Sequence, residues 1–128
     1  MYKRMGMPVL DLTIPRGVSV GDWVLYQLTM VAVFEELFFR GYLQGWFERI
    51  AVGLVSRQTM IFWFPVVASA FLFALAHMIV ALNVAGFVVF FPGLLFAWLR
   101  AKTGSLLPPV LAHGSANVFA QFLIRSVS

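Results

Sequence analysis

Long apolar stretches follow one another along the chain, separated by short segments with charges, glycine or proline. A helix needs about 20 apolar residues to cross a bilayer, and several stretches meet that length. Unbroken runs such as GFVVFFPGLLFAWL favour helices, which satisfy their own backbone hydrogen bonds in lipid. The pattern predicts an all-α, polytopic transmembrane helix bundle with about four membrane-spanning helices. The expected spans are Asp22–Phe47, Thr59–Val80, Leu82–Arg100 and Leu107–Ile124.

The segments between these spans have the composition of loops and turns. The stretch ERIAVGLVSRQ is the expected polar loop between the first two spans. Asn83 and Gly86 mark the expected turn between the second and third spans, and Gly104 and Pro108 mark a helix stop and a new start. Farther back, Gly41 and Gly45 form a small-xxx-small spacing that would let another helix approach closely.

The composition supports a membrane protein, because 62% of the residues are hydrophobic and only 11% are charged. The absence of cysteine excludes a thiol nucleophile, a disulfide framework and a cysteine-ligated metal. The net charge of +4 comes from scattered residues without a basic stripe, so no nucleic-acid partner is expected. Asp11, Pro15 and Arg16 interrupt the region where a signal peptide has its apolar run, so no cleavable signal is predicted.

Basic residues in loops usually indicate the cytoplasmic face of a membrane protein. With four spans, Lys3, Arg4, Arg16 and Arg125 fall on one face, and an equal number fall on the other: Arg49, Arg57, Arg100 and Lys102. The rule therefore does not choose a face. Tryptophans concentrate at membrane interfaces, and the candidates for such anchors are Trp23, Trp46, Trp63 and Trp98.

A few ionisable residues remain inside the predicted spans: Glu35, Glu36, Arg40 and both histidines, His77 and His113. Each charge near the bilayer centre costs about 2.5–3.5 kcal/mol, so we expect these side chains to pair or to line a wet cavity. Glu36 and Arg40 stand four residues apart on one helix face and should form an ion pair. Glu35 is rotated by about 100° from Glu36 and has no cation in its own helix.

This difference makes Glu35 the better candidate for chemistry, because an unpaired carboxylate can act as a general base. His113 and Asn117 share one helix face, and a histidine beside an amide suits the stabilisation of an oxyanion. Phe73 lies one turn before His77, where its ring could wall the site and orient the imidazole.

Each residue also has a plainer interpretation. A single intramembrane histidine often only bonds to a neighbouring helix, and a glutamate–arginine pair is often structural. The occurrence of all these groups together favours a common functional site. Glu35, His77 and His113 could instead be zinc ligands, although no HExxH motif is present.

Two further classes of function stay open. Sets of glutamate, histidine and arginine also line ion pathways, so a proton-coupled transporter is an alternative, although no inverted repeat is visible. The other alternative is a non-catalytic membrane immunity or peptide-binding protein. Replacement of Glu35 by glutamine separates this alternative from catalysis, since it removes the base and keeps the shape.

Three spaced motifs carry a family resemblance: Glu35-Glu36-x-x-x-Arg40, Phe73-x-x-x-His77 and His113-x-x-x-Asn117. With the approach RAKTGSLLPPVLAHGSAN, they resemble the CPBP family of intramembrane proteases. That family includes the CAAX prenyl endopeptidases of the Rce1 type and has long been grouped with abortive-infection proteins. The resemblance covers about Val31 to Phe119, and the domain it implies is a single CPBP-like protease domain over residues 1–128.

The resemblance implies an intramembrane endopeptidase of the glutamate type, historically described as metal-dependent. Its substrate would be a membrane-associated tail or leader, such as a CAAX-like tail or a sorting or leader peptide. Glu35 with His77 would activate a water, and His113 with Asn117 would hold the oxyanion. The supporting residues would be Glu36, Arg40 and Phe73. No cofactor is required on this mechanism; on the metal-dependent one, a divalent metal such as zinc would bind Glu35, His77 and His113.

The expected partners are membrane lipid and a peptide or protein substrate with a membrane-associated tail. Relatives usually have further helices before the first motif, whereas here about twenty residues precede the first span. We therefore expect a minimal member, a chain lacking the N-terminal helices of longer relatives, or a homo-oligomer that completes the bundle. The expected location is a bacterial or archaeal cell membrane.

Overall fold

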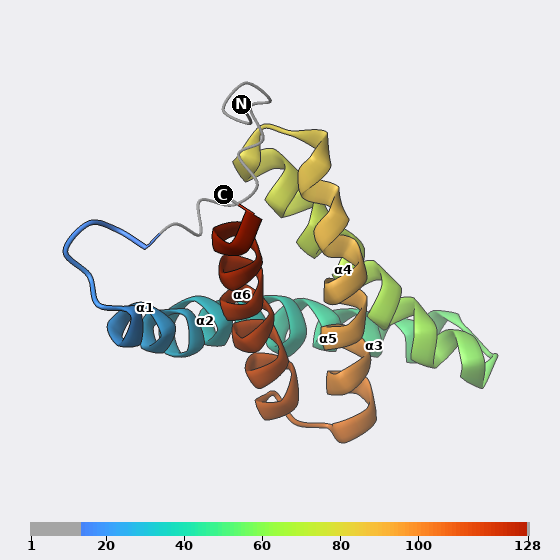
Figure 1. Cartoon of the computed structure of the whole chain (residues 1–128). Coiled ribbons are helices and arrows are strands. Elements are labelled where there is room, and N and C mark those ends of the chain that lie inside the picture. Colours follow the sequence, from blue (N-terminus) through green and yellow to red (C-terminus); the bar gives the residue numbers. More distant parts are fainter. Residues whose placement is uncertain (1–13, 128) are drawn as a thin grey trace.

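The computed structural model describes residues 14–127 of the chain. Within this range every regular element is a helix (Figure 1). The predicted all-α class is therefore confirmed. The interpretations that rest on Lys3, Arg4 and Asp11 concern residues outside the described range.

The first half of the described range contains one continuous helix from Val20 to Leu54. Ser19 caps its start, where the side-chain oxygen accepts a hydrogen bond from the backbone N–H of Asp22 at 3.1 Å. Two stretches of this helix are π-helical, a rare geometry that often occurs at functional sites. Its segments are α1 (Val20–Tyr26), η1 (Gln27–Ala32), α2 (Val33–Glu36), η2 (Leu37–Leu43) and α3 (Gln44–Leu54).

The C-terminal half consists of helices that double back on one another: α4 (Gln58–Ala81), the 3-10 segment η3 (Val84–Val89), α5 (Phe90–Thr103) and α6 (Leu107–Val127). Leu82 adopts a left-handed conformation after α4, and the Asn83 side chain accepts from the backbone N–H of Ala85 at 2.9 Å. Gly104 ends α5 with φ of 67°, a conformation that favours glycine. Both predicted breaks are confirmed.

The prediction of a polar loop between the first two spans is wrong for most of that segment. The helix continues through Leu54, so the first helix ends well beyond Phe47, and only residues 55–57 connect it to α4. Glu48 and Arg49 are good helix formers, and no proline interrupts this stretch. Their charges therefore lie on the surface of a helix rather than in a loop. The other three predicted stretches correspond closely to α4, to η3 with α5, and to α6.

Two of the four predicted spans have the length and apolarity needed to cross a membrane. These are Gln58–Ala81, with a mean hydropathy of 2.1, and Val84–Thr103, with 1.8. Much of the surface is apolar as well: Leu82 is 91% exposed and Val80 82% exposed. Large exposed hydrophobic side chains are normal where the solvent is lipid. Trp23, however, is only 5% exposed and is therefore not an interface anchor.

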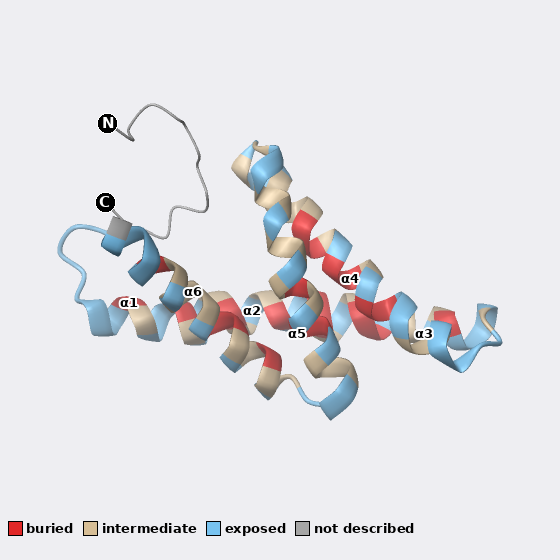
Figure 2. Ribbon diagram, turned by 45° about the vertical axis from the view of Figure 1, so that its right-hand side comes forward, coloured by how far each residue is buried: buried red, intermediate tan, exposed pale blue. Residues whose placement is uncertain are grey.

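The long N-terminal helix crosses the α5–α6 pair, and α4 packs against both α3 and α5 (Figures 1 and 2). Buried residues gather where these helices meet (Figure 2). Several of the fully buried residues are alanines, including Ala32, Ala70, Ala74 and Ala97. Small side chains let helix backbones approach closely, which is how membrane helices gain packing energy. This crossing region also contains the predicted site residues.

Gly86 is expected to be intolerant of a side chain. A Cβ there would lie 3.1 Å from both the carbonyl oxygen of His77 and the Cα of Met78, which are backbone atoms. We predict that Gly86→Ala lowers the free energy of unfolding by about 1–3 kcal/mol, because an overpacked contact must be relieved by moving backbone. Thermal unfolding in detergent measures the change.

The matched control for this variant is Gly53→Ala, near the end of α3. A Cβ at Gly53 meets nothing within 4 Å. Alanine should be neutral there or stabilise by about 0.5–1 kcal/mol, the usual advantage over glycine inside a helix. Equal unfolding midpoints for the two variants would show that α4 and η3 do not pack as described.

Candidate active site

A buried ion pair lies at the centre of the helix crossing. Arg40 Nε lies 3.2 Å from Glu36 Oε2, and both side chains are 0% exposed. The predicted pair is therefore confirmed. Arg40 Nη2 also donates to the carbonyl oxygen of Gly93 in α5 at 2.7 Å, and the guanidinium carbon lies 4.5 Å from the centre of the Phe73 ring. Such contacts repay part of the cost of burying the charge.

His113 is held by the same carboxylate. Its Nδ1 lies 2.8 Å from Glu36 Oε1, a hydrogen bond in which the imidazole donates and the carboxylate accepts. The ring also stacks on Phe96, with the ring centres 4.9 Å apart and the planes inclined by 13°. These contacts fix the imidazole plane and leave Nε2 as the nitrogen that faces Glu35.

His77 is fixed by its own helix. Its Nδ1 lies 2.8 Å from the backbone carbonyl of Phe73, so this nitrogen donates the hydrogen bond. The Phe73 ring, which is 2% exposed, packs against the imidazole with the ring centres 4.3 Å apart. The predicted position of Phe73 beside His77 is confirmed. His77 Nε2, which faces Glu35, can then accept a hydrogen bond, because one nitrogen of a neutral imidazole accepts when the other donates.

Glu35 is the accessible member of the group. Its Oε2 lies 3.7 Å from His77 Nε2 and 3.5 Å from His113 Nε2, and its side chain is 32% exposed. Both distances are longer than a good direct hydrogen bond. Adjacent glutamates in one helix therefore occupy different environments: Glu36 is sealed between an arginine and a histidine, and Glu35 faces two imidazoles from a partly open position.

Asn117 is held at a neighbouring position on α6. Its Nδ2 donates to Gln27 Oε1 at 3.0 Å, and Gln27 lies in η1 with an exposure of 6%. The structure therefore brings Glu35, Glu36, Arg40, Phe73, His77 and His113 into one connected cluster, while the hydrogen-bond partner of Asn117 comes from elsewhere on the first helix.

Three buried glutamines were missed by the sequence reasoning: Gln27, Gln44 and Gln121. Besides Gln27, Gln44 is fully buried, donates to the carbonyl oxygen of Ala97 at 3.0 Å and accepts from Ser69 at 3.3 Å. The available signal was the same for all three, because each is a polar amide inside a predicted membrane span. Polar residues in such positions usually bond to another helix.

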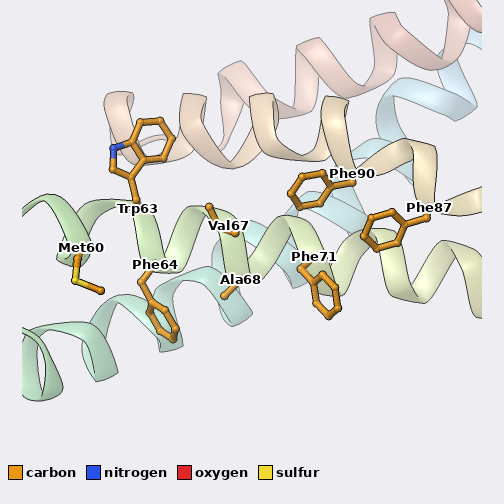
Figure 3. Close-up of a pocket in the computed structure, with 8 residues that line it drawn as sticks. All are labelled: Met60, Trp63, Phe64, Val67, Ala68, Phe71, Phe87 and Phe90. Atoms are coloured by element: carbon orange, nitrogen blue, oxygen red, sulfur yellow. The ribbon is translucent and has the colours of Figure 1, made fainter.

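In the described part of the chain, no three histidine, aspartate or glutamate side chains are arranged to hold a metal ion. An apolar cavity of about 510 Å³ is lined by side chains of α4, η3 and α5 (Figure 3). Its lining includes none of the predicted site residues and consists of Met60, Trp63, Phe64, Val67, Ala68, Phe71, Phe87 and Phe90. Such a surface suits lipid chains rather than polar chemistry.

Comparison with known protein families gives a match over most of the chain. Residues 19–119 match the family model for "Type II CAAX prenyl endopeptidase Rce1-like". The matched segment runs from the N-cap of the first helix into α6 and includes all of the predicted site residues. No curated protein and no solved structure matches the chain.

The different environments of Glu35 and Glu36 predict that their replacement by glutamine has different effects on the free energy of unfolding. We expect Glu36→Gln to lower the free energy of unfolding by about 3–5 kcal/mol, because it leaves the buried Arg40 without a counter-charge. Glu35→Gln should cost less than about 1 kcal/mol, since that side chain is partly exposed. Thermal and denaturant unfolding of the two variants in one detergent gives the comparison, and equal losses would contradict the scaffolding role of Glu36.

Proposed function

Since the chain belongs to the type II CAAX prenyl endopeptidase Rce1-like family, we propose that it hydrolyses a peptide bond with a water activated by Glu35 and His77. At the level of its family it is a CAAX-type membrane protease. The proposed substrate is a membrane-associated tail or leader peptide. The observation that carries the proposal is the Glu35 side chain, which is partly exposed as a whole but whose buried Oε2 faces the Nε2 atoms of both histidines and has no hydrogen-bond partner among the described residues.

The first step is the activation of water. Glu35 Oε2 and His77 Nε2 are both acceptors 3.7 Å apart, so a single water can donate one hydrogen to each. Its lone pair then points away from both groups and toward the substrate carbonyl. As the oxygen–carbon bond forms, Glu35 takes the proton, and this proton passes to the amine as the carbon–nitrogen bond breaks. No covalent enzyme intermediate is needed.

The second step is the stabilisation of the oxyanion. In the proposal His113 carries a proton on each nitrogen, so Nδ1 donates to Glu36 and Nε2–H is free to donate. This extra proton makes the cluster of Glu35, Glu36, Arg40 and His113 formally neutral. Asn117 uses one Nδ2 hydrogen on Gln27 and can offer the other to the oxyanion. Preorganised donors of this kind are usually the largest contribution to catalysis.

Glu36, Arg40 and Phe73 act as supports in this scheme. Glu36 orients His113 through a 2.8 Å hydrogen bond, Arg40 neutralises Glu36, and Phe73 anchors His77 through its carbonyl group. We propose that no metal is required. Zinc on Glu35, His77 and His113 is the alternative, and a chelator tests it directly. We further propose that all four helical stretches cross the membrane, which makes the protein multi-pass.

Glu35→Gln should abolish cleavage while the fold is retained. We predict a loss of about 10²–10⁴-fold in kcat, the usual contribution of a general base. Mass spectrometry of membrane-tethered peptides, in lipid and across prenylated tails, sorting tails and leaders, measures the cleavage and identifies the substrate class. Asp22→Asn is the matched control, because Asp22 is a carboxylate of the same helix that bonds to Ser19 at the exposed N-terminal cap and, within residues 14–127, to no residue of the Glu35 cluster.

The same assay with a chelator separates the two mechanisms. Cleavage should persist after chelation; a loss that zinc restores would overturn the metal-free proposal. Full cleavage by Glu35→Gln would remove Glu35 from the mechanism altogether.

Gln27 is predicted to act through Asn117 as a positioning residue. Asn117→Ala should lower kcat by about 10²–10³-fold, the usual loss for one oxyanion donor. Gln27→Ala should lower kcat by a smaller factor and leave KM unchanged, since it only frees the amide to rotate. The double variant should be no slower than Asn117→Ala alone, because both changes remove one function. Independent, multiplying losses would contradict this coupling; Gln58→Ala, at the exposed start of α4, is the control.

A further inference from the structure

A second polar feature lies between the first helix and α5, apart from the proposed active site. It is a cavity of about 500 Å³, comparable in size to the apolar one but lined by charged and small residues. None of its lining residues takes part in the Glu35 cluster: they are Gly41, Gly45, Glu48, Arg49, Val52 and Arg100.

The glycines form an open part of this cavity wall. A Cβ at Gly45 would meet nothing within 4 Å, and a Cβ at Gly41 would meet the Leu106 side chain at 3.5 Å. The prediction that another helix packs closely on both glycines is therefore wrong at Gly45. The first helix is instead held to α5 by the neighbouring Arg40 and Gln44, whose long side chains reach the α5 backbone. Space remains beside the glycines.

The cations of the cavity have no partner within residues 14–127. Neither Arg49 nor Arg100 makes an ion pair or a side-chain hydrogen bond there. Other basic groups of the bundle are engaged: Arg40 forms an ion pair with Glu36, and the Lys102 ammonium lies 5.1 Å from the Phe62 ring centre. Two unpaired guanidinium groups that line one cavity favour an anion, and arginine binds phosphate oxygens through paired N–H groups.

The position of the cavity in the chain indicates headgroup depth. Trp46 precedes Arg49 by less than one helical turn, and Trp98 precedes Arg100 in the same way. Both tryptophans are partly exposed, at 47% and 36%. Tryptophan and arginine concentrate where a membrane helix leaves the hydrocarbon, and basic pockets between helices bind lipid headgroups. The anion that such a pocket meets in a membrane is the phosphate of a phospholipid.

Glu48 narrows the chemical class of the ligand that fits this cavity. A carboxylate in the lining opposes a bare anion, but it can accept hydrogen bonds from an ammonium group. Two cations and one carboxylate complement a headgroup that carries both a phosphate and a primary ammonium. We propose that this cavity binds an aminophospholipid such as phosphatidylethanolamine, with the phosphate between Arg49 and Arg100 and the ammonium at Glu48.

The test measures lipid binding directly and does not depend on cleavage. The full chain is placed in nanodiscs of phosphatidylcholine with increasing phosphatidylethanolamine, and retained lipid is counted by native mass spectrometry after extraction. The wild type should retain phosphatidylethanolamine in preference to phosphatidylcholine. Arg49→Gln and Arg100→Gln should each weaken binding of both lipids by about fivefold, the effect expected for one basic residue at a membrane surface.

Glu48→Gln should act differently from the arginine variants. It should reduce the preference for phosphatidylethanolamine over phosphatidylcholine, because only the primary ammonium of phosphatidylethanolamine can donate a hydrogen bond to Glu48. Retention of both lipids through their phosphate groups should remain. Arg57→Gln is the matched control, because Arg57 is an exposed arginine outside the cavity. Unfolding midpoints in pure phosphatidylcholine show that each variant is folded. Arg100→Lys, which keeps the charge but not the paired N–H groups, should bind more tightly than Arg100→Gln and less tightly than the wild type.

Several outcomes would overturn the proposal. If the double variant Arg49→Gln/Arg100→Gln retained as much lipid as the wild type, the cavity would not be the binding site. If Arg57→Gln lost as much lipid binding as the cavity variants, the effect would be one of overall charge. Equal retention of the two lipids by the wild type would exclude recognition of the ammonium group. Displacement of lipid by inorganic phosphate alone would indicate a free-anion site. Displacement by a peptide with a free C-terminal carboxylate, but not by its amide, would assign the cavity to substrate.

Discussion

The buried pair of Glu36 and Arg40 is the interaction on which the rest of the structure depends. Neither charge can remain unpaired inside an apolar bundle, so each group must find partners on neighbouring helices. Arg40 bonds to the backbone of α5 at Gly93 and stacks on Phe73 of α4. Glu36 bonds to His113 of α6. A pair made within one helix thus joins all of the helices around it, and the catalytic geometry follows from that junction.

The need to pair buried charges also gives the adjacent glutamates, Glu35 and Glu36, different environments. Glu36 is sealed because its oxygens are committed to Arg40 and His113. Glu35, one residue away, turns toward the imidazoles and retains 32% exposure. The four-residue segment α2 that carries them lies between the π-helical turns η1 and η2. Within α2 the two carboxylates point apart because adjacent residues of an α-helix are rotated by about 100°.

Much of this arrangement could be predicted from local spacing and the family motifs. The four-residue interval predicted the Glu36–Arg40 pair, and Gly104 and Asn83 predicted breaks that the structure has. The partner of Asn117 could not be predicted, because Gln27 is 90 residues away and their contact depends on how α6 crosses η1. The π-turns also could not be predicted, since hydrogen-bond register within a helix responds to tertiary packing. The extension to Leu54 was missed for another reason: the charges of Glu48 and Arg49 favour a loop in a membrane protein, although both residues are good helix formers.

The first helix also relates the depth of the chemistry to the membrane surface. Glu35 and Arg49 stand fourteen residues apart, which is about 20 Å along a helix, and a tilt of that helix shortens the depth between them. A headgroup held at Arg49 would therefore place Glu35 well inside the hydrocarbon region, which is about 30 Å thick. At that depth water reaches the carboxylate only through the protein, which accounts for the need to leave Glu35 partly open while Glu36 is sealed. Lipid binding and hydrolysis would then be linked by geometry alone, because both depend on the tilt of one helix.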